Sequence, residues 1–339
     1  MSYAVAVDIG GTFTDLVGYD HETRRVVYTK SATTYGNFVE GILDCFEKAG
    51  LTPDQAHHIN HGTTLVINAY IQRRGARAAL VTTKGFRDIL EIARGNRPDP
   101  FDLHYKRDEP LIPRSLRFET PERIDTSGKV IEPLDLVALD ALADDLRAAA
   151  VESIAIFFMN SYANPEHEEI AAARLRELLP GVYITHSTEL TREWYEYERT
   201  STVAANAYVG PQVNTYIRRL EGDMKERGFA GPLFMMGSNG GLLSVERTCR
   251  QPVSLVESGP IGDDRQMRSG GKWAVQCRVH LLRQRLCEGF SHQIACHRYR
   301  GGGLGWRLRG LDRWPKPPAC GPAQRGIDAR PSLLPARRR

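Results

Sequence analysis

The chain has 339 residues, of which 41% are hydrophobic and 25% are charged, and a formal net charge of +4. These proportions are ordinary for a globular protein, and the length leaves room for two domains with separate cores. No run approaches the roughly 18–20 apolar residues that a membrane-spanning helix needs, so we expect no membrane association. The first residues, MSYAVAVDIG, contain Asp8 and lack a basic lead, so we expect no signal peptide and a cytoplasmic protein.

Charge and cysteine are distributed unevenly along the chain. Residues 264–339 hold 17 basic and 4 acidic side chains, a net charge of +13, whereas residues 1–263 carry a net charge of −9. Cys45 and Cys249 lie in the front part, and the other four cysteines lie in the tail. No pair has the C-x-x-C spacing of a zinc site, so the pattern argues for neither a metal nor a disulfide. The composition predicts a boundary near residue 263.

Strand and helix patterns alternate through the front part of the chain. The predicted strands are Tyr3–Ile9, Asp15–Asp20, Arg25–Lys30, Ala78–Val81, Leu116–Ile124, Ser153–Phe158, Tyr183–Thr185 and Leu233–Met236. The predicted helices are Phe38–Lys48 with a C-cap at Gly50, Leu136–Ala149, Asn164 to about Leu179, Glu193–Tyr208 and Pro211–Arg227. This alternation predicts an α/β fold with a largely parallel sheet.

The sequence VDIGGTFTD, which follows the first predicted strand, has the composition of a phosphate-binding loop. Gly10 and Gly11 let backbone N–H groups approach a polyphosphate without obstruction by a Cβ atom. Thr12 and Thr14 offer hydroxyl groups to phosphate oxygens. Asp8 could hold Mg²⁺ through the water shell of the ion, because Mg²⁺ retains several waters in proteins.

Two common nucleotide-binding loops are excluded for this segment. A Walker A loop needs Lys followed by Ser or Thr, and a dinucleotide fingerprint needs G-x-G-x-x-G at the start of a helix. Here the loop returns into a strand, an arrangement typical of the actin, sugar-kinase and Hsp70 group of ATPases. Taken alone, the segment is also compatible with an ordinary Gly-Gly hairpin turn.

The string DIGGTFTDLV resembles the N-terminal signature of the hydantoinase A / 5-oxoprolinase family, which includes the acetone carboxylase β subunit. Further matches follow in the order of that family, over about residues 3–262. They are His61-Gly62-Thr63-Thr64 with Asn68-Ala69, the stretch ALVTTKGFRDILEIAR, Glu198-Arg199-Thr200-Ser201-Thr202 with Asn206-Ala207-Tyr208-Val209, Ser238-Asn239-Gly240-Gly241, and Glu257-Ser258-Gly259-Pro260.

The resemblance implies an actin-like (ribonuclease H-like) ATPase fold and the use of ATP with Mg²⁺. It also implies the ATP-dependent hydrolysis of a cyclic amide, such as hydantoin or 5-oxoproline, by phosphorylation of the amide oxygen. The chain would then be the A-type subunit beside a hydantoinase B-type partner. The alternatives are an acetone carboxylase β-type subunit and an inactive nucleotide-binding fragment.

By the same resemblance, Gly10, Gly11, Thr12 and Thr14 would cradle phosphate, and Asp8 or Asp15 would orient magnesium or water. His61 would be an acid/base or a substrate contact, with a plain hydrogen-bonded histidine as the alternative.

The segment Ser238, Asn239, Gly240 and Gly241 would be a loop near the nucleotide, with a plain turn as the alternative. A structural salt bridge is expected for Arg199, which stands beside Glu196 and Glu198, with a role in the site as the alternative. We expect Lys84 and Arg87 on the solvated surface, with contact to a phosphate or a substrate carboxylate as the alternative. The cluster of Trp194, Tyr195 and Tyr197 is expected in the core, with a binding box as the alternative.

The resemblance divides the chain into three parts. Residues 1–185 would form an N-terminal domain with the phosphate hairpin, residues 186–262 would begin the main domain, and residues 263–339 resemble nothing in the family. With chosen codons and a one-base offset, Arg300–Trp306 can read Gly-Ala-Gly-Gly-Ser-Val-Gly, so we expect a frameshifted and largely disordered basic tail on an incomplete fold. A nucleic-acid-binding extension is the rival reading, but the tail has no recognisable binding module, so we expect no specific nucleic-acid partner.

Overall fold

The computed structural model describes residues 3–34, 37–95, 101–102, 104–105 and 108–256. The predicted tail and the motif at residues 257–260 lie outside the described residues. Among the helices that are described, none combines the length and the apolar character needed to cross a membrane.

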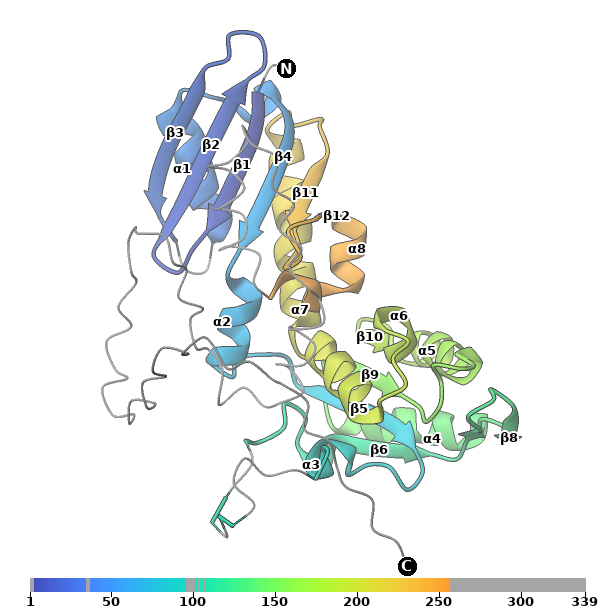
Figure 1. Cartoon of the computed structure of the whole chain (residues 1–339). Coiled ribbons are helices and arrows are strands. Elements are labelled where there is room, and N and C mark those ends of the chain that lie inside the picture. Colours follow the sequence, from blue (N-terminus) through green and yellow to red (C-terminus); the bar gives the residue numbers. More distant parts are fainter. Residues whose placement is uncertain (1–2, 35–36, 96–100, 103, 106–107, 257–339) are drawn as a thin grey trace, which may run out of the picture. The chain divides into compact units, whose positions relative to one another are not determined.

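The first sheet has six strands in the order β12-β11-β4-β1-β2-β3 (Figure 1). Its strands are β1 (Tyr3–Ile9), β2 (Phe13–Asp20), β3 (Val26–Ala32), β4 (Ala56–Thr63), β11 (Leu233–Met236) and β12 (Leu242–Ser244). The strands β1, β2 and β3 form an antiparallel meander, and β4 and β11 run parallel to β1. Helix α1 (Phe38–Ala49) packs on the face that carries Val5 and Val7, and it ends at Gly50 in the predicted αL C-cap.

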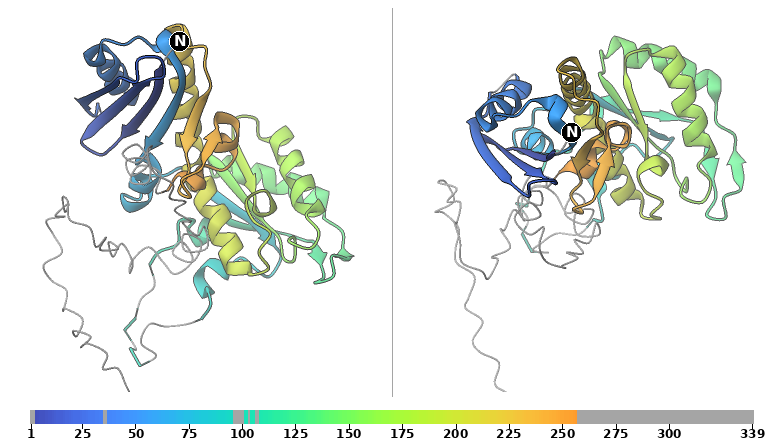
Figure 2. Two further views of the ribbon diagram at one scale, coloured as in Figure 1. Left: turned by 45° about the horizontal axis from the view of Figure 1, so that its top comes forward. Right: turned by 90° about the horizontal axis from the view of Figure 1, so that it is seen from above.

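The second sheet has four strands in the order β10-β9-β5-β6, all parallel. These strands are β5 (Ala78–Thr83), β6 (Arg117–Thr120), β9 (Ser153–Phe157) and β10 (Tyr183–His186). Every residue of β5 and β9 is buried, as expected for parallel strands covered on both faces. Helices α4 (Leu136–Ala148), α5 (Glu166–Leu178) and α7 (Glu196–Glu226) contribute apolar residues to this core. Figure 2 shows the ribbons of these helices beside the strands of this sheet.

Helix α7 is one continuous helix of 31 residues, so the prediction of two helices broken before Pro211 is wrong. Proline removes one backbone hydrogen bond and costs about 3 kcal/mol in a helix interior. Packing on both sides of this point outweighs that cost. Val203 and Ala207 belong to the core of the second sheet, whereas Val209 and Val213 belong to the core of the first.

Other predicted elements agree with the structure to within a few residues, apart from the predicted strand Leu116–Ile124. That stretch divides into β6 and the short strand β7 (Arg123–Ile124), which pairs with β8 (Val130–Glu132). Strand β4 was not predicted, because its sequence AHHINHGT has no apolar alternation. The remaining short helices are α2 (Leu65–Ile71), α3 (Ile89–Ile92), α6 (Ser187–Leu190), α8 (Val245–Arg250), and the 3₁₀ turns η1 (Pro53–Gln55), η2 (Arg114–Leu116) and η3 (Pro252–Leu255).

Candidate functional site

Three of the predicted motifs meet at one edge of the six-stranded sheet. In the parallel register, Val7 of β1 lies beside His61 of β4, which lies beside Met235 of β11. The carboxyl ends of these strands therefore lie side by side, and they are followed by the Gly10-Gly11 turn, by Thr64 and by the loop that begins at Gly237. The carboxyl edge of parallel strands is the usual place for a ligand in open α/β sheets.

The β1–β2 connection is a tight hairpin that its neighbours hold in place. The Gly10 N–H donates to the carbonyl of Phe13 at 2.9 Å. Thr33 donates its N–H to the carbonyl of Thr12 at 2.9 Å and its hydroxyl to the carbonyl of Gly10 at 3.0 Å. On the other side, Thr64 donates both its N–H and its hydroxyl to the carbonyl of Ile9. The predicted return of the loop into a strand is confirmed, and Thr33 and Thr64 are additional members of the site.

Neither glycine of this hairpin has a positive φ, so the backbone conformation alone does not demand glycine. A Cβ atom on Gly10 would lie 3.2 Å from the carbonyl oxygen of Phe13, which is a tight contact. Gly11 and Thr12 are exposed to solvent. An exposed glycine presents no Cβ atom to a ligand that approaches the turn.

Asp8 and Asp15 are direct cross-strand partners near the base of the hairpin. Both lie on the face of the sheet opposite to Val7 and α1, because side chains alternate along a strand. Asp8 is buried, and Asp15 accepts a hydrogen bond from the hydroxyl of Tyr28 and pairs with Lys30 at 3.2 Å. The structure thus brings together the two carboxylates that the sequence singled out.

Thr14 and His61 lie on the other face of the sheet. Thr14 is fully buried, and its hydroxyl oxygen lies 3.4 Å from that of Thr33 and against Gly41 of α1. This placement favours a role in seating α1 beneath the hairpin over a direct phosphate contact. The exposed Thr12 is the better placed of the two predicted threonines.

His61 is buried, and each of its two ring nitrogens has a hydrogen-bond partner. Its Nδ1 lies 3.2 Å from the carbonyl oxygen of Val7, and its Nε2 is bonded to the hydroxyl of Tyr216 on α7. A carbonyl can only accept, so Nδ1 carries the proton and Nε2 accepts from Tyr216. Burial lowers the pKa of His61 to about 4, so the ring is neutral at pH 7. The structure does not bring His61 together with Asp8 and Asp15, and its acid/base role stays a prediction.

The Ser238–Gly241 segment forms a turn between β11 and β12 at the same edge. The side chain of Asn239 accepts from the N–H of Gly241 at 2.8 Å, and Gly240 adopts a φ of 73°. Ser238 donates its N–H and its hydroxyl to the carbonyl of Ser254, both at 2.8 Å. The segment lies at the same edge as the Gly10-Gly11 turn and its own groups close it as a turn, so its place near a nucleotide stays a prediction.

Arg199 is buried in a polar network at the carboxyl edge of the second sheet. Its guanidinium donates to the hydroxyls of Ser161 and Ser187 and to the carbonyl of Phe158. Both serine hydroxyls also donate to the buried carboxylate of Glu168, at 2.7 Å.

The carboxylate that shares these serine hydroxyls with Arg199 is Glu168, and neither Glu196 nor Glu198, which stand beside Arg199 in the sequence. Glu198 instead pairs with Arg94. Glu198 adjoins Arg199 in the sequence and points in a different direction, whereas Glu196 lies three positions away on the same side of α7 and acts on Arg199 only through its charge.

The same edge holds a second buried polar cluster. His167 Nδ1 lies 2.8 Å from Glu122 Oε2, and the other carboxylate oxygen of Glu122 accepts from the hydroxyl of Thr83. Burial raises the pKa of Glu122. No motif in the sequence indicates this cluster, because its members lie far apart along the chain, on β5, on α5 and just after β6.

The aromatic prediction is wrong for two of its three members. Trp194 and Tyr195 are 65% and 42% exposed and contact one another, with Arg94 over the ring of Tyr195. The segment before α7 contains Arg192, Glu193 and Glu196, so it lacks the apolar neighbours that would bury the rings. Lys84 is exposed as predicted, but Arg87 is partly buried and donates to the carbonyl of Arg117.

Sequence and structure comparisons agree on the relatives of this chain. The model of the hydantoinase/oxoprolinase N-terminal region matches residues 4–179, and the hydantoinase/oxoprolinase model matches residues 199–267. Caprolactamase subunit alpha from Pseudomonas jessenii is 33% identical over 267 residues, which are 76% of this chain and 38% of that protein. The 5-oxoprolinase of Saccharomyces cerevisiae is 27% identical over 299 residues, which are 76% of this chain and 23% of that protein.

Two solved structures share the fold. The ATP-dependent caprolactamase from Pseudomonas jessenii aligns with a TM-score of 0.69 at 34% identity, over 76% of this chain and 39% of that one. Nucleotide-free acetone carboxylase aligns with a TM-score of 0.68 at 25% identity, over 77% and 39%. The expected actin-like α/β fold is confirmed, and the chain spans about two fifths of the length of these solved relatives. The two family models and the shared fold establish that the chain belongs to the hydantoinase/oxoprolinase family.

Proposed function

We propose that this chain binds ATP at the carboxyl edge of the six-stranded sheet and uses it, as an A-type subunit, to hydrolyse a cyclic amide. The observation that carries the proposal is the hairpin at Gly10 and Gly11. It is exposed, it has ordinary φ values, and Thr33 and Thr64 clamp it beside the Asp8–Asp15 pair. Relatives named as ATP-dependent caprolactamase and 5-oxoprolinase support the same reaction class.

The proposed chemistry makes an unreactive carbonyl reactive. The nitrogen of a lactam donates electrons into its carbonyl, so water attacks the ring carbon only slowly. Transfer of the γ-phosphoryl group to the amide oxygen releases ADP and turns that oxygen into a leaving group. Water then attacks the ring carbon, and the C–N bond of the ring breaks to give a free amine and an acyl phosphate. A second water hydrolyses the acyl phosphate to a carboxylate and phosphate. The protein contributes positioning and electrostatic stabilisation.

The residues divide these tasks by position. The backbone of Gly10, Gly11 and Thr12 faces the phosphates. Asp8 would hold Mg²⁺ through bound water, since Mg²⁺ is commonly held by one or two carboxylates and retains the rest of its water shell. Among the described residues, no group of three His, Cys, Asp or Glu side chains is placed so that it could hold a metal ion by itself. When bound, Mg²⁺ neutralises phosphate charge.

The response of the chain to different substrates separates this proposal from two alternatives. The acetone carboxylase β subunit of Xanthobacter autotrophicus is 28% identical over 279 residues, so a carboxylase-type subunit is the second enzyme candidate. An inactive nucleotide-binding fragment is the third. Release of ADP by the 339-residue chain should be measured with hydantoin, 5-oxoproline and acetone, with and without a hydantoinase B-type subunit. Stimulation by a cyclic amide supports the hydrolase, and stimulation by acetone alone supports the carboxylase.

Nucleotide binding tests the hairpin itself. We expect Gly11→Val to weaken the binding of ATP with Mg²⁺ by at least about ten-fold, because a branched side chain blocks the backbone N–H groups. The matched control is Gly222→Ala, since Gly222 lies on α7 with open space around its Cβ position. The proposal is wrong if titration calorimetry gives the same ATP affinity for Gly11→Val as for the control.

A further inference from the structure

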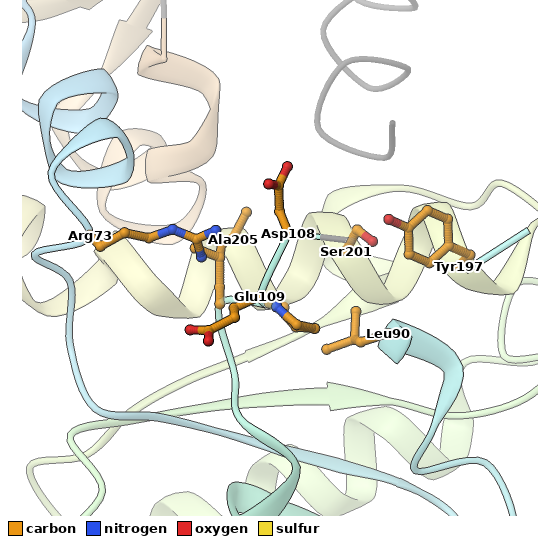
Figure 3. Close-up of a pocket in the computed structure, with 10 residues that line it drawn as sticks. Arg73, Leu90, Asp108, Glu109, Tyr197, Ser201 and Ala205 are labelled. Atoms are coloured by element: carbon orange, nitrogen blue, oxygen red, sulfur yellow. The ribbon is translucent and has the colours of Figure 1, made fainter. Parts of the chain in front are cut away.

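A pocket of about 70 Å³ lies against helix α7, apart from the hairpin (Figure 3). Its floor is Ser201, Ala204 and Ala205, which share one face of the helix because they are three and four positions apart. Small side chains at these positions leave room above the helix. The other lining residues are Arg73, Leu90, Asp108, Glu109, Pro110, Leu111 and Tyr197. Helix α2, about 10 Å long, connects Thr64 of the hairpin edge to the segment of Arg73.

Arg73 occupies a backbone position that normally suits glycine. It follows α2 with a φ of 53°, its N–H donates to the carbonyl of Tyr70, and the N–H of Arg74 donates to the carbonyl of Ala69. These two bonds define a Schellman motif, in which the left-handed residue is usually glycine. A side chain in this conformation is strained, and such strain often persists where the residue has a function.

The segment around Arg73 is also held firmly on α7. Ala76 donates its N–H to the carbonyl of Tyr208 at 2.8 Å, and the side chain of Gln212 donates to the carbonyl of Arg74 at 2.9 Å. In Figure 3 the side chain of Arg73 extends along α7 toward Ala205, and the hydroxyls of Tyr197 and Ser201 point toward one another. The guanidinium of Arg73 and the hydroxyls of Tyr197 and Ser201 therefore line the same pocket.

We propose that this pocket binds the ring of the cyclic amide, and that it selects a neutral ring with both C=O and N–H edges over a ring that carries a carboxylate. The apolar lining, Leu90 and Ala205, contacts ring atoms. Arg73 donates to a ring carbonyl, and Asp108 or Glu109 accepts from a ring N–H. A free carboxylate would meet two acidic side chains for one basic side chain, which disfavours it. The inference rests on the proposed function for the choice of ligand.

Binding of hydantoin and of 5-oxoproline to the full chain tests the proposal, measured by saturation-transfer NMR titration without nucleotide. We expect hydantoin to bind more tightly than 5-oxoproline, and Arg73→Gly to weaken hydantoin binding by about ten-fold, because a charged hydrogen bond is lost. Ser201→Leu fills the pocket and should abolish binding. Equal or tighter binding of 5-oxoproline overturns the charge selection, and unchanged hydantoin binding in either variant overturns the pocket.

A second glycine substitution controls for folding. Ala150 follows α4 with a φ of 49° and makes the same pattern of backbone bonds, so Ala150→Gly relieves equivalent strain away from the pocket. Both glycine variants should keep or raise the unfolding midpoint, and only Arg73→Gly should lose hydantoin binding. If both lose it, the proposal fails. Normal ATP binding with no hydantoin binding contradicts the pocket alone, whereas hydantoin binding that depends on Arg73 without any ATP binding contradicts the proposed function.

Discussion

At the carboxyl ends of its parallel strands, the six-stranded sheet carries glycines and threonines, whereas the four-stranded sheet carries buried charged side chains. At the first edge, Thr33 and Thr64 bind the carbonyls of the hairpin and leave Gly11 exposed. At the second edge, Glu168 and Arg199 share the hydroxyls of two serines and are both buried. Both edges lie at the carboxyl ends of parallel strands, so the side chains at each edge decide which of them is open to a ligand. The edge with Gly11 is the open edge, and the edge with Glu168 and Arg199 is the closed edge.

The closed edge satisfies its own polar groups. Burial alone would raise the pKa of Glu168, but the ring of His186 at 3.6 Å, the charge of Arg199 and hydrogen bonds from Ser187 and from the N–H of Phe158 bring it below its ordinary value. A buried carboxylate that is ionised and fully hydrogen-bonded has little capacity left for a ligand. The second edge is therefore structural, and the comparison predicts different effects of substitution at the two edges.

The largest expected effect is at the closed edge. Arg199→Met removes the guanidinium and leaves the carboxylate of Glu168 buried without its counter-charge, so we expect a loss of about 3–5 kcal/mol in the free energy of unfolding. Urea unfolding of the full chain measures it. The control is Arg147→Met, because Arg147 forms an exposed pair with Asp144 and should change stability by less than about 1 kcal/mol. Equal losses in the two variants would contradict a structural network at this edge.

The second prediction is that protonation of the buried His61 makes the free energy of unfolding depend on pH. Unfolded histidine binds a proton with a pKa near 6.5, but folded His61 does so only at about 4, so protons favour the unfolded chain between these values. The wild type should therefore lose up to about 3 kcal/mol of stability from this group as the pH falls from 6.5 to 4. His61→Asn should lack that loss.

Urea unfolding at several pH values, with wild type and variant side by side, isolates the contribution of His61. The control is His104→Asn, which alters an exposed histidine outside this strand and should follow the wild-type profile. A difference in unfolding free energy between wild type and His61→Asn that stays constant from pH 7.5 to 4.5 would show that His61 is not buried as a neutral ring.

The open edge was largely predictable from the sequence, and the closed edge was not. The Gly10-Gly11 hairpin is local, so nine consecutive residues reveal the strand, the turn and the returning strand. Glu168 and Arg199 are 31 positions apart, and no spacing along the chain marks them as partners. His61 is an intermediate case. The motif identified it as a candidate site residue, but only the sheet register shows which face of the sheet it occupies.

Helix α7 shows a second limit of sequence reasoning. Gly210 and Pro211 predict a break, and nothing local contradicts that prediction. A Cβ atom on Gly210 would lie 2.3 Å from the ring of Tyr183, so this glycine provides room for an aromatic ring from β10 and does not end the helix. The reason for the residue is a tertiary contact, which the local pattern does not contain.

The smallest predicted effect tests whether the position of the Gly10-Gly11 hairpin depends on helix α7. Tyr216→Phe removes the hydroxyl that donates to His61 and leaves a buried nitrogen acceptor without its donor, so we expect a loss of about 1–2 kcal/mol in the free energy of unfolding. Because His61 in turn holds the carbonyl of Val7, hydrogen exchange should accelerate in residues 7–12 and stay unchanged in β5 and β9. Tyr195→Phe, at an exposed tyrosine just before the same helix, is the control. Acceleration spread evenly over both sheets would mean that the Tyr216–His61 pair supports the whole fold, whereas acceleration confined to the hairpin would mean that α7 sets the position of the open edge through this one contact.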